Sequence, residues 1–332
     1  MIDRPFAVLG AGNMGTALAL VLSRHERSVN LYCIEPDVAQ DINARHRNAK
    51  YLPGVRLPRN IRAFGNVAEA LEGAEAAIVA VPSFAIEEAV TLSLPFLAPD
   101  CIVGIVTKGL DRKTLQPKIE TARCLLPPRM RKHVCAVSGP AIATELAKGR
   151  PAAILLAGED AASLKKLAGF LADGMLKVAI SGDLHGASLC MALKNAYAIG
   201  LGMCDGLGYP MNSKALVLTL ALEEMSGFVR AAGGDPKTVM TLAGLGDLVV
   251  SGFSSHGRNR TYGERIVGSR TKDPSRLGLG LVEGIDTTAT ALRLARQLRI
   301  KTPLLSAIGK CLAAEKHFEK PFTTYLHNLT LL

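Results

Sequence analysis

The second half of the chain contains side chains that could transfer a proton and hold an anion. Lys194 and Asn195 are adjacent within a helical stretch of small and apolar residues. A lysine in such surroundings is partly desolvated, which lowers its pKa and suits it to act as a general base. Further along, Arg258 precedes Asn259, and a guanidinium can bind a phosphate through two parallel hydrogen bonds. These residue types could move a proton at an anchored, anionic substrate.

A third candidate is Asp247, a carboxylate on the glycine-bracketed turn Gly244–Leu248. Taken singly, each candidate also has a structural explanation, such as helix capping, snorkelling or solvation. Taken together they match the needs of hydride transfer from a secondary alcohol. That reaction requires a base for the hydroxyl proton, donors for the developing oxyanion, an anchor for the substrate, and a redox cofactor.

A glycine-rich segment near the start of the chain would supply the cofactor site. Gly10-Ala11-Gly12-Asn13-Met14-Gly15 has the spacing G-x-G-x-x-G, between a predicted strand and a predicted helix. In such a turn the first glycine allows the tight bend, the second lets the backbone approach a pyrophosphate, and the third lets helix and strand pack closely. The N–H groups at the helix start would then bind the anion.

Other candidates follow later predicted strands. Glu35 lies 25 residues after Gly10, near the place of the acid that binds the adenosine ribose, and its charge favours NAD over NADP. A solvated loop carboxylate is the alternative. Pro82, in Val81-Pro82-Ser83, and Lys108, in Thr107-Lys108-Gly109, end further strands. Ligands of such sheets bind beyond the carboxyl ends of strands, so Lys108 could meet an anionic ligand.

The elements that must position these residues change character along the chain. The first part alternates short apolar runs with helical stretches, which indicates strands buried on both faces and a parallel sheet. From about residue 183 only helical periodicity is found. We therefore predict a Rossmann-like, doubly wound, mostly parallel α/β domain over residues 1–182 and an all-α domain over residues 183–332. The predicted strands are 6–9, 29–34, 76–81, 101–107, 134–138, 152–156 and 177–180, and the predicted helices are 17–24, 84–93, 161–172, 184–204, 214–232, 286–299 and 303–314.

Composition excludes several classes of protein. Of the 332 residues 48% are hydrophobic and 20% are charged, which is typical of a folded globular chain. The net charge of +10 is dispersed, so we expect small anionic ligands rather than nucleic acid. We expect no membrane span and a cytoplasmic protein. The seven cysteines form no C-x-x-C pair, which favours free thiols and no metal site.

The ordered motifs resemble the NAD(P)-dependent glycerol-3-phosphate dehydrogenase family along nearly the whole chain. The matching segments are GAGNMGTALA, N-x-x-Y-L-P-G from Asn48, TKGL, SGPAIATELAKGRPAA, ALKNAYAIGLG-x-x-DGLG, GLGDL, GRNR and VEG. The resemblance implies interconversion of glycerol 3-phosphate and dihydroxyacetone phosphate with NAD, or alternatively NADP. It also implies a role in phospholipid precursor synthesis, and it leaves monomer and homodimer open.

The resemblance also implies roles for individual residues. Lys194 looks like the general base, with Lys108 and Asp247 as further catalytic residues. The implied substrate-binding residues are Lys108, Gly139, Lys194, Asn195, Asp247, Ser251, Gly257, Arg258 and Asn259. The implied cofactor-binding residues are Gly10, Gly12, Asn13, Met14, Gly15, Glu35, Pro82, Lys108, Ala143, Arg258, Leu281 and Glu283.

The chain departs from the usual bacterial pattern at several supporting positions. They are Asn13-Met14, Glu35, Ala141, the segment before Ala192 (Ser188, Cys190 and Met191) and Leu220-Ala221. Two alternatives therefore stay open. A β-hydroxyacid dehydrogenase shares the architecture, but its expected Lys-x-x-Asn spacing is absent. A non-catalytic dinucleotide sensor would predict a disrupted base or anion clamp.

Overall fold

The computed structural model describes residues 4–330, and the chain divides into two compact units. The first comprises the chain up to Lys108 together with Lys118–Leu184, and the second comprises Gly109–Pro117 together with the chain from His185 onward. The short segment Gly109–Pro117 thus leaves the first unit and belongs to the second.

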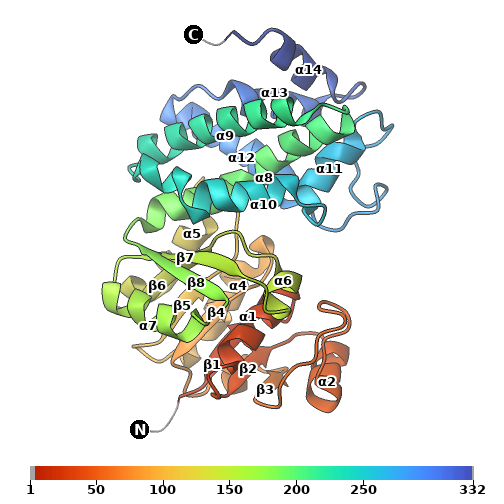
Figure 1. The fold of residues 1–332 in the computed structure, drawn as a ribbon. Helices are drawn as coiled ribbons and strands as arrows, with labels where there is room; N and C mark the ends of the chain where they lie inside the picture. The colour runs from red at the N-terminus through yellow and green to blue at the C-terminus, as the bar shows by residue number, and fades with distance from the viewer. Residues whose placement is uncertain (1–3, 331–332) are drawn as a thin grey trace. The chain divides into compact units, whose positions relative to one another are not determined.

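An eight-stranded sheet forms the centre of the first unit, in the order β3-β2-β1-β4-β5-β6-β7-β8 (Figure 1). Neighbouring strands are parallel except β6 and β7, which are antiparallel. The order reverses between β1 and β4, which creates the crevice where such sheets bind ligands. The strands are β1 (Phe6–Leu9), β2 (Val29–Tyr32), β3 (Ile61–Phe64), β4 (Ala76–Val79), β5 (Ile102–Ile105), β6 (Val134–Ser138), β7 (Ala152–Gly158) and β8 (Leu176–Ser181).

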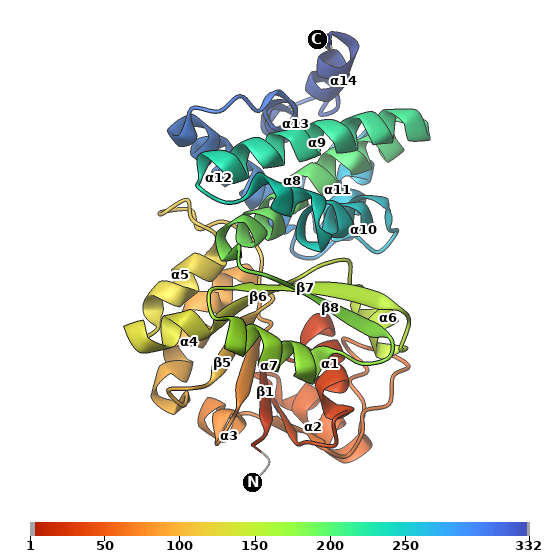
Figure 2. The ribbon, with the colours of Figure 1, turned by 60° about the vertical axis from the view of Figure 1, so that its left-hand side comes forward.

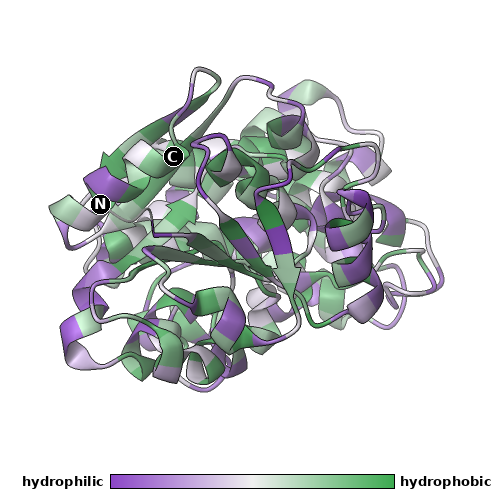
Figure 3. Cartoon of the chain, turned by 90° about the horizontal axis from the view of Figure 1, so that it is seen from below, coloured by the Kyte–Doolittle hydropathy of each residue, from purple (hydrophilic) through white to green (hydrophobic). Residues whose placement is uncertain are grey.

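Helices cover both faces of this sheet (Figure 2). Side chains of α1, α2, α6 and α7 share one buried apolar cluster on one face, while α3, α4 and α5 pack in sequence on the other. The strands are mostly hydrophobic in colour in Figure 3, as strands covered on both faces should be. These helices are α1 (Asn13–Ser23), α2 (Pro36–Arg45), α3 (Val67–Leu71), α4 (Ile86–Ser93), α5 (Lys118–Leu125), α6 (Ala143–Ala147) and α7 (Ala161–Leu171), with short 3-10 turns η1 (Ser83–Ala85), η2 (Leu94–Phe96) and η3 (Pro128–His133).

Within the residues described from His185 onward, the regular secondary structure of the second unit is entirely helical. Its long central helix α8 is the one described helix that has the length and composition to cross a membrane, and it is fully buried as a core helix. The elements of this unit are α8 (Leu184–Gly206), α9 (Met211–Ala231), η4 (Pro236–Met240), the π-helical turn η5 (Leu242–Gly246), α10 (Asp247–Phe253), α11 (Arg258–Ile266), α12 (Glu283–Leu298), α13 (Pro303–Ala313) and α14 (Lys320–His327).

The predicted fold class is confirmed, and two kinds of detail differ. The predicted strands 29–34, 76–81 and 101–107 end earlier, at Tyr32, Val79 and Ile105, because the chain leaves the sheet there to form loops. Strand β3 and the helices α2, α3, α5, α6, α10, α11 and α14 were not predicted from the sequence. Most of these elements are short, and α2 and α11 are rich in polar residues, so their apolar periodicity is weak.

Candidate active site

Of the three glycines in the turn between β1 and α1, two stand at positions that no other residue fits. Gly10 has φ +113°, and a Cβ atom there would lie 2.9 Å from the carbonyl oxygen of Ala80. A Cβ atom on Gly15 would lie 1.9 Å from the carbonyl oxygen of Gly10. At Gly12 a Cβ atom would meet nothing within 4 Å, so this glycine faces open space. Tight packing at the first and third glycines and an open second one are what a dinucleotide turn requires.

The backbone N–H groups at the start of α1 receive no side-chain cap from the protein. Gly12 is the N-cap residue and gives no side-chain hydrogen bond. Asn13 is exposed, while Met14 packs against the apolar cluster below. An anion at this helix start would meet free N–H groups and the positive end of the helix dipole. The turn therefore fits the pyrophosphate of NAD(P), which supplies the hydride acceptor or donor when bound.

Asn48, the first residue of the N-x-x-Y-L-P-G motif, holds this turn in place. Its buried amide Nδ2 donates to the carbonyl oxygen of Ala11 at 2.8 Å and to Oγ1 of Thr16 at 2.9 Å. Both are hydrogen bonds between segments far apart in sequence. The N-x-x-Y-L-P-G motif therefore stabilises the glycine turn through its first residue.

Glu35 stands at the N-cap of α2, just beyond β2, and its carboxylate is already engaged. Its Oε1 accepts a hydrogen bond of 2.6 Å from the hydroxyl of Tyr51, and its Oε2 is paired with the ammonium of Lys50. The Lys50 and Tyr51 contacts hold the pKa of Glu35 below its usual value. Tyr51 belongs to the N-x-x-Y-L-P-G motif, but nothing in the sequence connects it, or Lys50, with Glu35.

The remaining candidates of the first unit follow strands. Pro82 begins the turn after β4, Lys108 lies beyond β5 and is partly buried, Gly139 follows β6 with φ +127°, and Ala143 begins α6. Each therefore lies in a segment beyond the carboxyl end of a strand, where ligands of such sheets bind.

In the second unit the candidate base is buried and paired. Lys194, on α8, is 3% exposed and its Nζ is ion-paired with Oδ1 of Asp247 on α10. The same Nζ donates to Oγ of Ser251 at 2.7 Å. An ammonium and a carboxylate that are both desolvated must pair to remain charged. The structure thus brings Lys194 together with two residues that follow it by more than fifty positions in the sequence.

A second polar link starts from the next residue of α8. Oδ1 of Asn195 accepts a hydrogen bond of 3.0 Å from Nδ2 of Asn259, whose Oδ1 accepts from the backbone N–H of Gly284 at 2.9 Å. Nδ2 of Asn195 is buried and has no hydrogen-bond partner. Buried donors are rarely left unpaired, so an unpartnered amide next to the candidate base is suited to a substrate oxygen.

Glycines and an unusual turn allow the helices α8, α10, α11 and α12 to approach closely enough for these hydrogen bonds. A Cβ atom on Gly284 would lie 2.5 Å from the carbonyl oxygen of Asn195, and one on Gly257 would lie 2.4 Å from that of Ser251. Asp247 directly follows the π-helical turn η5, a feature often found at functional sites. The motifs GLGDL, GRNR and VEG are therefore packing motifs as well as carriers of polar side chains.

Arg258 and the predicted cofactor-binding residues Leu281 and Glu283 occupy more open positions. Arg258 is exposed at the first residue of α11, after Gly257 at the N-cap. Leu281 is 44% exposed and Glu283 begins α12. These placements leave Arg258 able to reach a ligand, while Asn259 is engaged in linking α8 to α12.

Two further polar networks in this unit were not predicted from the sequence. Asp205 on α8 is paired with Lys214 on α9 at 2.8 Å and with Arg260 on α11 at 2.6 Å. Glu224 on α9 accepts the hydroxyl of Tyr197 at 2.9 Å and two backbone N–H groups at the start of α13. Single charged residues in helical stretches carry no sequence signal that predicts such partners.

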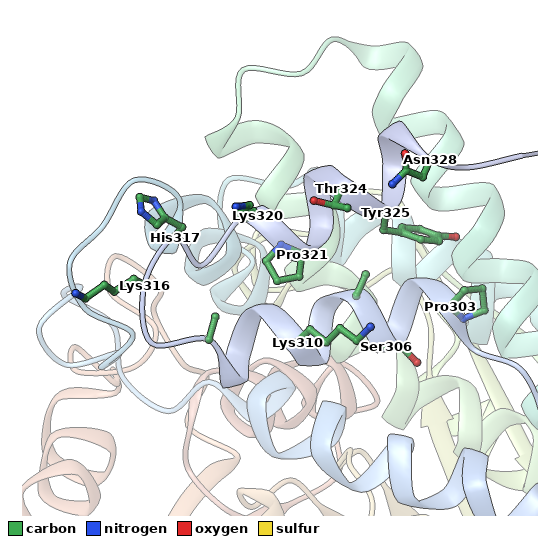
Figure 4. Close-up of a pocket in the computed structure, with 12 residues that line it drawn as sticks. Pro303, Ser306, Lys310, Lys316, His317, Lys320, Pro321, Thr324, Tyr325 and Asn328 are labelled. Carbon is green, nitrogen blue, oxygen red and sulfur yellow. The ribbon is translucent and has the colours of Figure 1, made fainter.

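One cavity of about 490 Å³ lies elsewhere, between α13 and α14 (Figure 4). Ser306, Lys310, Lys320 and Tyr325 are among its lining residues, and none of the candidate site residues is. No group of three or more His, Cys, Asp or Glu side chains within residues 4–330 could hold a metal ion. The seven cysteines are free, and all but Cys124 are buried.

A sheet with a dinucleotide-type glycine turn, joined in one chain to a helical unit with a buried lysine–aspartate pair, defines the class of NAD(P)-dependent dehydrogenases. Family models assign the chain more narrowly. The model for the N-terminus of NAD-dependent glycerol-3-phosphate dehydrogenase matches residues 5–164, and the model for its C-terminus matches residues 183–323. The chain belongs to this family.

Individual relatives match nearly the whole chain. A protein of Chlorobium phaeobacteroides (strain BS1), named glycerol-3-phosphate dehydrogenase with NAD(P)+, is 34% identical over 94% of both chains. One of the same name from Anaeromyxobacter sp. (strain K) is 36% identical over 92% of both. The crystal structure of glycerol-3-phosphate dehydrogenase from Coxiella burnetii has a TM-score of 0.90 and 32% identity, covering 98% of this chain and 99% of that one.

Proposed function

We propose that this chain interconverts sn-glycerol 3-phosphate and dihydroxyacetone phosphate, with NAD(P) as hydride carrier and Lys194 as general acid and base. The observation that carries the proposal is the buried Lys194–Asp247 pair beside the unpartnered amide of Asn195. The names of the full-length relatives supply the substrate.

The pair is suited to the proton step of ketone reduction. When hydride reaches the carbonyl carbon of dihydroxyacetone phosphate, negative charge develops on the oxygen. The ammonium of Lys194 would donate its proton to that oxygen, and Nδ2 of Asn195 would donate a hydrogen bond to it. Asp247 and Ser251 keep Nζ in one position, so little rearrangement is needed as the charge forms. In the oxidation direction the same nitrogen would accept the alcohol proton.

The substrate phosphate would bind at the start of α11. Arg258 is exposed there, and the helix N-terminus adds N–H groups that favour an anion. Asn259 retains one amide hydrogen for the phosphate while the rest of its side chain is engaged. Ser251, Gly257, Lys108 and Gly139 complete the proposed substrate contacts, and Ala143, Leu281 and Glu283 the proposed cofactor contacts.

We assign residues 1–182 to dinucleotide binding and residues 183–332 to substrate binding and catalysis. We further propose that the protein is cytoplasmic and makes glycerol 3-phosphate for phospholipid synthesis. Homodimer formation remains a separate prediction, which sedimentation of the purified protein would test.

The direct test is reduction of dihydroxyacetone phosphate by the purified protein, followed as loss of NADH or NADPH absorbance. Turnover is expected with the phosphorylated ketone, and much slower turnover with unphosphorylated dihydroxyacetone, because Arg258 would lack its anion. Oxidation of a 3-hydroxy acid without any reaction of dihydroxyacetone phosphate would overturn the proposal.

A further inference from the structure

The contacts around Glu35 bear on which cofactor the chain accepts. A lone carboxylate beyond β2 would bind a ribose 2′-hydroxyl and repel a 2′-phosphate. Here the carboxylate is not alone, because Lys50 is paired with Oε2 and the Tyr51 hydroxyl donates to Oε1. The local group of three therefore carries no net charge, and the repulsion of a 2′-phosphate is largely cancelled.

We propose that Lys50 is the residue through which this chain accepts NADPH, by neutralising Glu35 and binding the 2′-phosphate. The inference rests on the proposed function and concerns the adenosine end of the same cofactor site. It assigns the cationic contact to the loop after α2 instead of to the segment directly after β2, where Cys33 is buried and Ile34 is apolar and 78% exposed.

The carboxylate can still serve NADH while it is paired. An ionised carboxylate has about four acceptor positions on its two oxygens, and Lys50 and Tyr51 use two of them. A ribose hydroxyl can therefore donate to Glu35 without displacing either partner. Tyr51 keeps the carboxylate in one orientation, since its hydroxyl donates to Oε1 while Lys50 pairs with Oε2.

Lys50 is also free enough to move. Its side chain is 50% exposed, against 30% for Glu35, and its Nζ lies 5.3 Å from the centre of the Tyr51 ring. The four-carbon stem gives the ammonium several ångströms of reach. With NADPH, the ammonium can turn one of its three N–H donors to the doubly charged 2′-phosphate while it stays paired with Glu35, and the N-terminus of α2 adds a favourable dipole.

The test compares kcat/KM for NADH and NADPH, with dihydroxyacetone phosphate, in the parent and in Lys50→Met. The variant should lose about 10- to 100-fold in kcat/KM with NADPH, the range for one hydrogen bond to a charged group. With NADH it should stay within about threefold, since exposed ion pairs contribute little. The control is Arg47→Met, which removes an equal charge from the same loop but pairs with Asp41, and it should change the two cofactors equally.

A binding measurement separates this inference from the proposed reaction. Adenosine 2′,5′-bisphosphate and 5′-AMP are titrated against the full-length protein by calorimetry. Lys50→Met should weaken the bisphosphate by the same factor as NADPH and leave 5′-AMP unchanged. If Lys50→Met weakens both probes alike, or neither, Lys50 is only a structural counter-ion and the inference is wrong. If neither cofactor supports turnover while the bisphosphate result holds, the proposed reaction fails and the inference stands.

Discussion

Two lysines of the helical unit have similar surroundings and different proposed tasks. Lys194 is 3% exposed and paired with Asp247, while Lys214 is 6% exposed and paired with Asp205. Removing Lys194 leaves the buried carboxylate of Asp247 uncompensated, at a cost of about 3–5 kcal/mol in stability, whereas Asp205 keeps its second partner Arg260 when Lys214 is removed. Burial and pairing alone therefore do not distinguish a base from a structural ion. The unpartnered amide of Asn195 beside Lys194 does.

Lys194→Met should lower kcat by about 10²- to 10⁴-fold, the usual contribution of a general acid or base. NADH affinity should not change, because the cofactor turn is built by other residues. Lys214→Met is the control for the loss of a buried, paired amine; it should lose less stability, because Arg260 still compensates Asp205, and keep a kcat close to that of the parent. Steady-state kinetics and urea unfolding of both variants check this, and equal losses of kcat would remove Lys194 from the acid–base role.

Glu224 makes folding stability depend on pH. Burial raises the pKa of Glu224 to about 7, although the Tyr197 hydroxyl and the N–H groups of Leu304 and Leu305 favour its ionised form. The folded state thus holds this proton more tightly than the unfolded state, whose pKa is near 4.5. The stabilisation is fully present below pH 4.5 and is lost as pH rises to about 7, by about 3 kcal/mol at most.

Glu224→Gln should flatten this part of the stability profile, since an amide does not titrate. The measurement is the free energy of unfolding in urea at pH 5 and at pH 7.5. Glu223→Gln changes an exposed neighbour and should keep the slope of the parent. An unchanged slope in Glu224→Gln would show that another group is responsible.

At the scale of elements, α8 and α11 approach each other through glycines. A Cβ atom on Gly202 would lie 1.9 Å from the carbonyl oxygen of Arg260, and one on Gly263 would lie 2.0 Å from that of Ile199. The pairing of Asp205 with Arg260 ties the same two helices together. This close packing sets the position of the start of α11, where Arg258 stands.

Gly263→Ala should therefore destabilise the protein by about 1–3 kcal/mol, the usual cost of overpacking, and raise KM for dihydroxyacetone phosphate. Gly227→Ala is the matched change in α9, where a Cβ atom meets nothing within 4 Å. It should stabilise by about 0.5–1 kcal/mol, because alanine favours a helix. Thermal unfolding and steady-state kinetics distinguish the two, and an unchanged KM in Gly263→Ala would contradict the positioning role.

At the scale of the whole molecule, cofactor binding should stabilise the folded chain. NADH at 100 times its dissociation constant should add about 2.7 kcal/mol to the free energy of unfolding. Hydrogen exchange should slow at the glycine turn and the start of α1. Gly15→Ala should lose both effects, whereas Gly169→Ala, on an uncrowded position of α7, should keep them. Equal stabilisation of the two variants would place the cofactor elsewhere.

Local patterns were sufficient to predict the class of fold and most of its long elements. Buried parallel strands are short and almost wholly apolar, and α8, α9, α12 and α13 have strong apolar content or periodicity, so both could be read from neighbouring residues. The short strand β3 and the polar helices α2 and α11 could not, because their stability comes from tertiary packing.

Lys194, Asp247 and the Arg258–Asn259 pair could all be identified as candidate site residues from the sequence. The sequence alone also determined the glycine spacing and the family. The pairing of the site residues was decided by packing, since Lys194 and Asp247 lie on different helices that glycines allow to come close. The same holds for Glu35, whose type was evident but whose partners Lys50 and Tyr51 come from another loop. Charge and spacing are local properties of a chain, whereas the partner of a charge depends on which distant segments fold against it.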